Sequence, residues 1–281
     1  MVERNKSFQI AANVIMILLS AMCIVPFILL IMSSITKENI LLKYGYSFWP
    51  REISFDAYKT LLVDSGSIVR GYIISALVTV VGTVANLTLT TLFAYPLSRK
   101  ELPGKAFFSF VIFFTMLFNG GLVPSYMMWT GIFHIKNTIW ALIVPNLLMG
   151  AFYVIMMRTY FTTNIPDAVI EAARIDGAGR LKTIWYIIIP MLGPILKIIL
   201  MLAITSAFHD ITNVMVLTEG GPTNSTMVMS LYGYRYFFPV SAAESTVPQY
   251  GYGAAVSVVS AAITGIVTVL YLKASKKLDD I

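Results

Sequence analysis

Six apolar stretches, each long enough to cross a lipid bilayer as a helix, recur along the chain. The hydrocarbon core of a bilayer needs about 20 mainly apolar residues per helix. The stretches cover residues 10–33, 69–97, 106–129, 138–158, 191–217 and 252–272. Only 12% of the residues are charged, whereas a soluble domain carries about 25%. The sequence therefore predicts an all-α membrane protein with six transmembrane helices in a single domain, residues 1–281.

The lysines and arginines predict how these helices are oriented. The net charge of +6 could indicate a nucleic-acid partner, but the basic residues flank the apolar stretches, so no nucleic acid is expected. A cytoplasmic N-terminus places 13 lysines and arginines inside and seven outside, as the positive-inside rule favours. Both termini are thus expected in the cytoplasm. The first stretch contains Pro26 and no small-residue cleavage pattern, so it is interpreted as a retained helix rather than a signal peptide.

The longest inner loop, residues 159–190, contains a polar elbow, EAARIDGAGRLKTIWYIIIP. Pro166 suits the first position of a helix, and Asp167 complements the positive end of its dipole. Gly177 suits a left-handed helix end. We expect one helix from Pro166 to about Asp176 and a second over 180–189. The pair could dock on another protein; the alternative is an amphipathic helix lying on the membrane surface.

This elbow resembles the EAA loop of permease subunits in binding-protein-dependent ABC importers. The matching residues are Glu171, Ala172, Ala173, Gly177 and Pro190, with Ile165-Pro166 before them. The run Asp176-Gly177-Ala178 is similar to carbohydrate permeases of the maltose-transporter type. The segments 118–128 and 137–161 resemble the branch that imports oligosaccharides released from polysaccharides. LTEGGPTNST (217–226) resembles a loop of the longer partner permease, which leaves open which half of a heterodimer this chain forms.

The resemblance implies a type I ABC importer permease fold in a bacterial plasma membrane. It implies a coupling role for the elbow, with Glu171 as the polar anchor and Asp176 beside the close-approach residues Ala172, Ala173 and Gly177. The implied partners are a second permease, two ATP-binding subunits, an extracellular solute-binding protein and a sugar or oligosaccharide. No GxxxxGK[ST] stretch is present, so ATP and magnesium are expected on the partner subunits. The chain itself is expected to have no catalytic residue, metal or cofactor.

Polar and aromatic residues inside the apolar stretches are candidates for a translocation pathway, because polar groups at membrane depth usually face protein or water. Amides pair with sugar hydroxyls, and aromatic faces cover sugar rings. The candidates are Asn119, Tyr126, Trp129, Asn146, Tyr153 and Asn213. Each asparagine could instead form an interhelical hydrogen bond, and each aromatic residue an interfacial anchor. The FNGG run and the prolines at 124 and 145 predict broken helices.

Three other functions remain open at this stage. An ion-coupled carrier would need a midplane charge, for which Asp210 is the candidate, and His209-Asp210 could form a proton relay. A membrane enzyme would need converging carboxylates or a metal cluster, to which His134 and His209 give little support. An ABC permease could also carry a solute other than a sugar.

Overall fold

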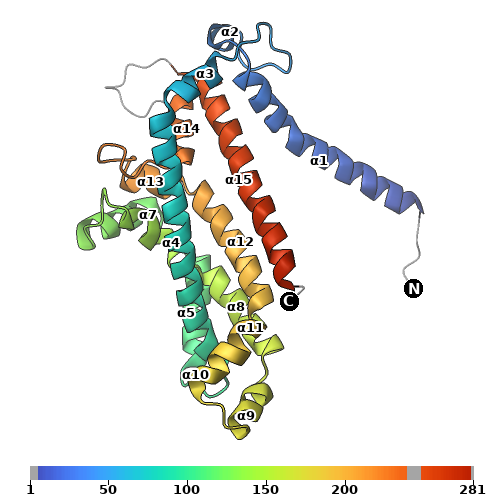
Figure 1. The fold of residues 1–281 in the computed structure, drawn as a ribbon, viewed down its shortest axis with the longest axis vertical. Coiled ribbons are helices and arrows are strands. Elements are labelled where there is room, and N and C mark those ends of the chain that lie inside the picture. The colour runs from blue at the N-terminus through green and yellow to red at the C-terminus, as the bar shows by residue number, and fades with distance from the viewer. Residues whose placement is uncertain (1–5, 239–247, 280–281) are drawn as a thin grey trace. The chain divides into compact units, whose positions relative to one another are not determined.

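The computed structural model describes residues 6–238 and 248–279, which form helices joined by short connections (Figure 1). An isolated bridge between Thr36 and Ile53 is the only β-pairing in these residues. The chain divides into two compact units. One contains residues 1–69 and 232–266, and the other contains residues 70–231 and 267–281.

Three helices are long and apolar enough to span a membrane by themselves: α1 (Lys6–Ser34), α4 (Ser65–Ser98) and α15 (Tyr250–Asp279). The described residues also contain three bent helix pairs. If each pair counts as one span, the total is six. The expected all-helical membrane fold is therefore confirmed. The most apolar window of α1 contains no buried residue, so lipid or a partner must cover this helix.

The third and fourth expected spans are bent rather than straight. Helix α5 (Lys105–Leu117) meets α6 (Leu122–Met127) and the π-helix η1 (Met128–Ile132) at 114°. Phe118 is extended there and Gly121 has a φ of +88°. Helix α7 (Trp140–Leu147) meets α8 (Ala151–Asn164) at 50°. The first break lies at FNGG, as predicted. The second lies between Leu147 and Ala151, after Pro145, which is itself inside α7, and Pro124 lies inside α6 without a break.

The fifth expected span, 191–217, is wrong as a single helix. Helix α12 (Gly193–His209) ends before Asp210, and α13 (Thr212–Leu217) is separate. The preceding segment is helical from Arg180 to Met191, as α10 (Arg180–Thr183), the π-helix η2 (Ile184–Ile188) and α11 (Ile189–Met191). It meets α12 at 67°. The bend falls where Gly193 and Pro194 begin the new helix, because proline cannot supply an intrahelical N–H.

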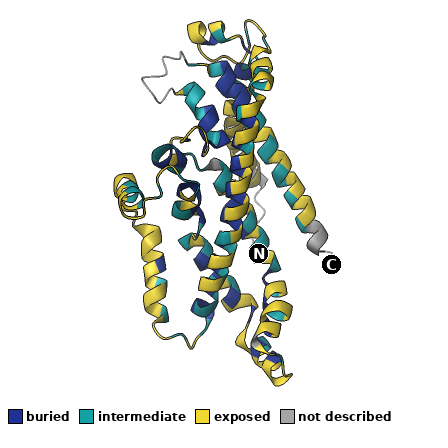
Figure 2. Cartoon of the chain, turned by 60° about the vertical axis from the view of Figure 1, so that its left-hand side comes forward, coloured by how far each residue is buried: buried dark blue, intermediate teal, exposed yellow. Residues whose placement is uncertain are grey.

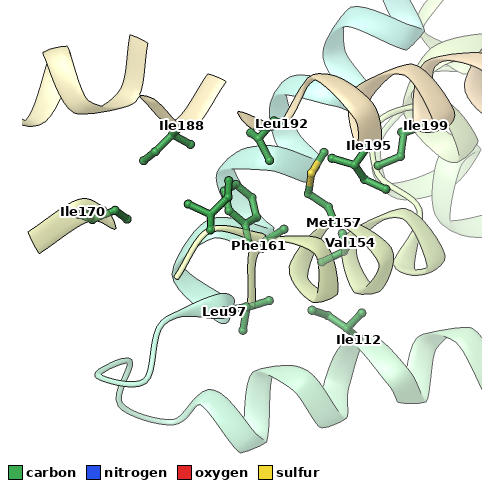
Figure 3. Close-up of a cluster of buried hydrophobic side chains, with 12 residues drawn as sticks. Leu97, Ile112, Val154, Met157, Phe161, Ile170, Ile188, Leu192, Ile195 and Ile199 are labelled. Atoms are coloured by element: carbon green, nitrogen blue, oxygen red, sulfur yellow. The ribbon is translucent and has the colours of Figure 1, made fainter. Parts of the chain in front are cut away.

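The longer unit has one apolar cluster built mainly from four helices (Figure 3). Leu97 comes from α4, Ile112 from α5, Phe161 from α8 and Ile195 from α12. Ile170 joins them from α9 (Asp167–Ile175). The inner loop, residues 159–190, therefore packs Phe161, Ile165, Ile170 and Ile188 into the same core as the long helices.

In the other unit, α15 begins against α2 (Glu38–Tyr44). In the sequence, α2 and α3 (Asp56–Val63) come between α1 and α4. The carboxylate of Glu38 accepts the backbone N–H groups of Tyr250 at 2.6 Å and Gly251 at 2.8 Å. The first turns of α15 are buried, and its residues 261–275 are mostly exposed (Figure 2). Tyr232 on α14 (Met229–Phe237) donates to Asp64 and bonds Tyr252 at 3.1 Å. Burial, and then the bond to Asp64, raise the pKa of Tyr232.

Glu38→Ala is expected to destabilise this unit, because two N–H groups at the start of α15 lose their acceptor. The loss of such a cap costs about 1–2 kcal/mol. Thermal unfolding of the detergent-purified chain measures it. Glu52→Ala is the control, because Glu52 pairs with Lys37 at a site where both side chains are about half exposed, and such pairs contribute little. Equal effects of the two substitutions would contradict a capping role for Glu38.

Candidate functional site

The elbow predicted from the sequence is present as α9 and the turn after it. Pro166 precedes the first residue of the helix, Asp176 follows the last, and Gly177 has a φ of +79°. Two hydrogen bonds close the turn, from Ala178 N to Ala173 O at 2.9 Å and from Gly177 N to Arg174 O at 3.1 Å. This pair of bonds is a Schellman motif. The helix and its end therefore agree with the prediction to within one residue.

The sides of α9 differ sharply in exposure. Ile170 and Ala173 are buried, at 7% and 6% exposure. The other predicted coupling residues, Glu171, Ala172, Asp176 and Gly177, are exposed. Ile175 shares their side and is 85% exposed. An apolar side chain among small and acidic residues gives this helix a surface suited to a protein groove rather than to lipid.

A second candidate site is a polar pocket of about 350 Å³ that is open on one side and lined by residues of α4, α7, α8 and α12 and by Asp210. Its lining residues come from segments far apart in the sequence. They are Gly82, Thr83, Asn86, Asn146, Leu147, Tyr153, Ala203, Ser206 and Asp210. The pocket is the size of small-molecule sites, and most of its polar groups are amides and hydroxyls.

Asp210 is the hydrogen-bonding centre of this pocket. Its carboxylate accepts Asn146 Nδ2 at 3.1 Å and Asn213 Nδ2 at 3.0 Å. Nearby, the hydroxyls of Tyr153 and Ser206 lie 3.2 Å apart. The structure thus brings three of the six predicted pathway residues together: Asn146 and Tyr153 line the pocket, and Asn213 bonds its carboxylate.

The other three predicted pathway residues lie elsewhere, around the α5–α6 bend and η1. Asn119 accepts the backbone N–H of Gly121 at 2.9 Å. Tyr126 accepts a hydrogen bond from Lys136 at 2.8 Å, which raises the pKa of that lysine. The Trp129 ring lies 5.0 Å from that of Phe133. None of the three lines the pocket, and their role in a pathway stays a prediction.

Sequence reasoning did not select Thr83 and Ser206, since single hydroxyl residues are common in apolar helices. A pattern could have found Thr83. Buried polar residues recur on α4 at intervals of three or four, which places them on one face of the helix. They are Ser75, Thr79, Thr83, Asn86 and Thr90.

The hydroxyl oxygen of Thr83 is buried and has no hydrogen-bond partner. Buried polar groups are normally paired, so this hydroxyl is available to a molecule in the pocket. Beside it, a Cβ on Gly82 would lie 2.6 Å from Leu147 Cδ1. Glycine therefore permits the close approach of α4 and α7 that shapes this wall.

The described residues contain no group of three or more histidine, cysteine or carboxylate residues able to hold a metal. The side chain of His209 lies outside the described residues. The two candidate sites are thus a pocket lined by amides and hydroxyls and helix α9, which packs Ile170 into the apolar cluster and exposes Glu171, Ala172 and Asp176 on another side.

Comparisons with known proteins identify the family of this chain. Residues 80–278 match the family described as "Binding-protein-dependent transport system inner membrane component". The chain is 30% identical to a polygalacturonan/rhamnogalacturonan transport system permease of Bacillus subtilis, over 74% of this chain and 70% of that protein. It is 29% identical to a multiple sugar-binding transport system permease of Streptococcus mutans, over 85% and 84% of the two chains.

A solved structure is similar over nearly the whole chain. It is a bacterial ABC transporter involved in the import of the acidic polysaccharide alginate. The match covers 97% of this chain and 98% of the chain in that structure. The TM-score is 0.79 and the sequences are 26% identical. With the family match over residues 80–278, the helical architecture and the exposed elbow, the chain belongs to the inner membrane components of binding-protein-dependent transport systems, the permease subunits of ABC importers.

Proposed function

We propose that the chain forms one half of a translocation pathway that imports an oligosaccharide. The observation that carries this proposal is the polar pocket. Its amides, hydroxyls and tyrosine are groups that pair with sugar hydroxyls and cover sugar rings. The permease relatives named for polygalacturonan and for multiple sugars, and the alginate transporter, support a carbohydrate cargo over another solute.

The charge of the pocket favours an uncharged sugar ring at this wall. Asp210 contributes a carboxylate, and no lysine or arginine is among the lining residues. A uronate carboxylate about 5 Å from Asp210 would be repelled by about 3 kcal/mol at an effective dielectric constant of 20. The similar solved transporter is involved in the import of an acidic polysaccharide, alginate, so this chain would differ from it in the cargo that its half of the pathway accepts.

Energy for import would come from other polypeptides. Two ATP-binding subunits would hold ATP and magnesium, because the chain has no GxxxxGK[ST] stretch and would not hydrolyse ATP itself. The exposed face of α9, with Glu171 as anchor, would sit in a groove on one of them. A second permease would complete the pathway, and an extracellular solute-binding protein would deliver the sugar.

Both termini would be cytoplasmic, which places α9 on the side where ATP is available. An ion-coupled carrier has no ATP-binding subunit, so the exposed face of α9 would have no docking partner.

The test is purification of the tagged chain from its native membrane in mild detergent, with mass spectrometry of the co-purifying proteins. A second permease and an ATP-binding protein are expected. The recovered complex, with its binding protein, is then reconstituted in liposomes. Uptake of a neutral oligosaccharide is expected to exceed uptake of a uronate oligosaccharide of equal length. A chain that purifies alone and transports under an ion gradient would overturn the importer, and preferred uptake of the uronate would overturn the neutral cargo.

A further inference from the structure

An arginine just beyond the end of α4 is bonded to the first residue of α9. Arg99 follows Ser98, the last residue of α4, and its Nη1 donates to Oδ1 of Asp167. The guanidinium also lies over the Tyr95 ring, with its carbon 4.7 Å from the ring centre. Its side chain is 18% exposed. Of the ion pairs among residues 6–238 and 248–279, this is the one that joins α9 to a long helix.

Two other donors of Arg99 have no acceptor. Nε and Nη2 are buried, and neither has a hydrogen-bond partner. Buried donors without acceptors lower stability, and native structures contain few of them. The Asp167 side chain is 48% exposed, and ion pairs that reach solvent contribute little to stability. The contribution of Arg99 to the fold therefore does not account for its presence, and a role in transport is the better explanation.

An open pocket of about 400 Å³ lies between α9 and the residues that follow α4. Its charged lining residues are Arg99, Lys100, Glu101, Asp167, Glu171 and Arg174. Ile170 of α9 also lines it and belongs to the apolar cluster that includes Leu97 (Figure 3). A helix beside such a pocket has room to shift. The ion pair then determines whether the end of α4 shifts with it.

Helix α4 leads from this pair to the polar pocket. It is continuous from Ser65 to Ser98 and carries Gly82, Thr83 and Asn86, which line the pocket. The distance along the helix from Thr83 to Ser98 is about 22 Å at 1.5 Å per residue. Lys105 Nζ bonds the carbonyl of Arg99 at 3.1 Å and that of Ser98 at 3.4 Å, so the end of the helix is braced. A pull on Arg99 therefore acts on the wall of the pocket.

We propose that the Arg99–Asp167 pair passes the movement of α9 along α4 to the pocket. Arg99 is then a positioning residue for transport, an inference that rests on the proposed importer function. The Nε–Nη2 edge of a guanidinium is its bidentate edge for a carboxylate. Neither donor on that edge has an acceptor, so a shift of α9 that uncovers the edge would let Asp167 pass from Nη1 to it. The pair thus stays together in both arrangements of α9.

The experiment compares Arg99→Asp, Asp167→Arg and the double substitution in the reconstituted importer, measuring sugar taken up per ATP hydrolysed. Each single substitution is expected to lower this ratio about tenfold, within the usual 5- to 150-fold range of coupling. The double substitution, which restores an opposite pair, is expected to recover several-fold over either single change. Lys273→Asp is the matched control, with the same charge change at an exposed residue of α15 that does not line this pocket, and is expected to keep the wild-type ratio. Unfolding temperatures measured on all variants separate lost coupling from lost stability.

A second readout needs no cargo. Cys23 is the one cysteine of the chain, so Cys23→Ser with Val84→Cys allows a single fluorophore on α4 next to Thr83, at a residue that is 60% exposed. ATP binding to the partner subunits is expected to change its emission, and Asp167→Asn, a small neutral change, is expected to abolish the response.

An unchanged uptake ratio in Arg99→Asp, or a full fluorescence response in Asp167→Asn, would overturn the link. A wild-type complex that responds to ATP but takes up no sugar would overturn the proposed cargo alone, since the fluorescence comparison still tests the pair.

Discussion

Replacing Gly177 by proline is expected to stop uptake while leaving the chain inserted in the membrane. Gly177 has a φ of +79°, and its N–H bonds the carbonyl of Arg174. Proline fixes φ near −65° and has no N–H, so the turn after α9 cannot form. The docking face would then point away from its groove. We expect uptake below about a tenth of wild type, the scale of loss when an allosteric coupling of 1–3 kcal/mol is removed.

The measurement pairs uptake in liposomes with the amount of chain recovered from membranes. Gly179→Ala is the matched control, because Gly179 has an ordinary φ and no neighbour within 4 Å of an added Cβ. Glu171→Lys tests the docking face without changing the backbone, and it is expected to release the ATP-binding subunit on purification. Normal uptake in both Gly177→Pro and Glu171→Lys would rule out the coupling role of α9.

Asn146→Leu is expected to reduce sugar uptake strongly without preventing assembly. The Asn146 amide donates to Asp210 and lines the pocket. Leucine is similar in size but cannot donate, so it removes one amide from the wall and leaves the carboxylate with fewer donors. Losing a hydrogen bond to a charged group costs about 1.5–3 kcal/mol, which predicts a fall in uptake of about tenfold or more.

The six predicted pathway residues supply their own comparison. Asn119→Leu makes the same chemical change at the α5–α6 bend, away from the pocket, and is expected to have a smaller effect on uptake. Subunit recovery on purification is measured for both variants. If Asn146→Leu instead prevents assembly, or if the two substitutions lower uptake equally, the pocket is not where sugar passes.

Features set by neighbouring residues could be predicted from the sequence. The straight spans were expected at 10–33, 69–97 and 252–272, and the helices run over 6–34, 65–98 and 250–279. Hydropathy predicts the length of a spanning helix well, because the thickness of the bilayer sets how many apolar residues the helix needs. The ends of α9 were predicted to within one residue, because Pro166 and Gly177 act locally.

Features that depend on contacts between distant residues could not be predicted. Hydropathy reports compatibility with lipid and not straightness, so it gave no angle for any bend and missed the break at Asp210. The bond between Asn146 and Asp210 joins two helices that the sequence alone cannot place side by side. The Arg99–Asp167 pair has the same origin. The sequence shows each of these four residues as a polar or charged side chain but does not show which residue it bonds.

The three bent helix pairs have a consequence for how the chain is made. Helices α7 and α8 have eight and 14 residues, and each is too short to cross a bilayer that requires about 20. Their break leaves backbone groups that lipid cannot satisfy. During synthesis, each bent pair must therefore leave the translocon as one unit. Other helices must soon afterwards pack over the backbone groups at its break. Helix α12, which closes the pocket beside them, is synthesised later, so nascent chains halted before it are the form that quality-control proteases would meet.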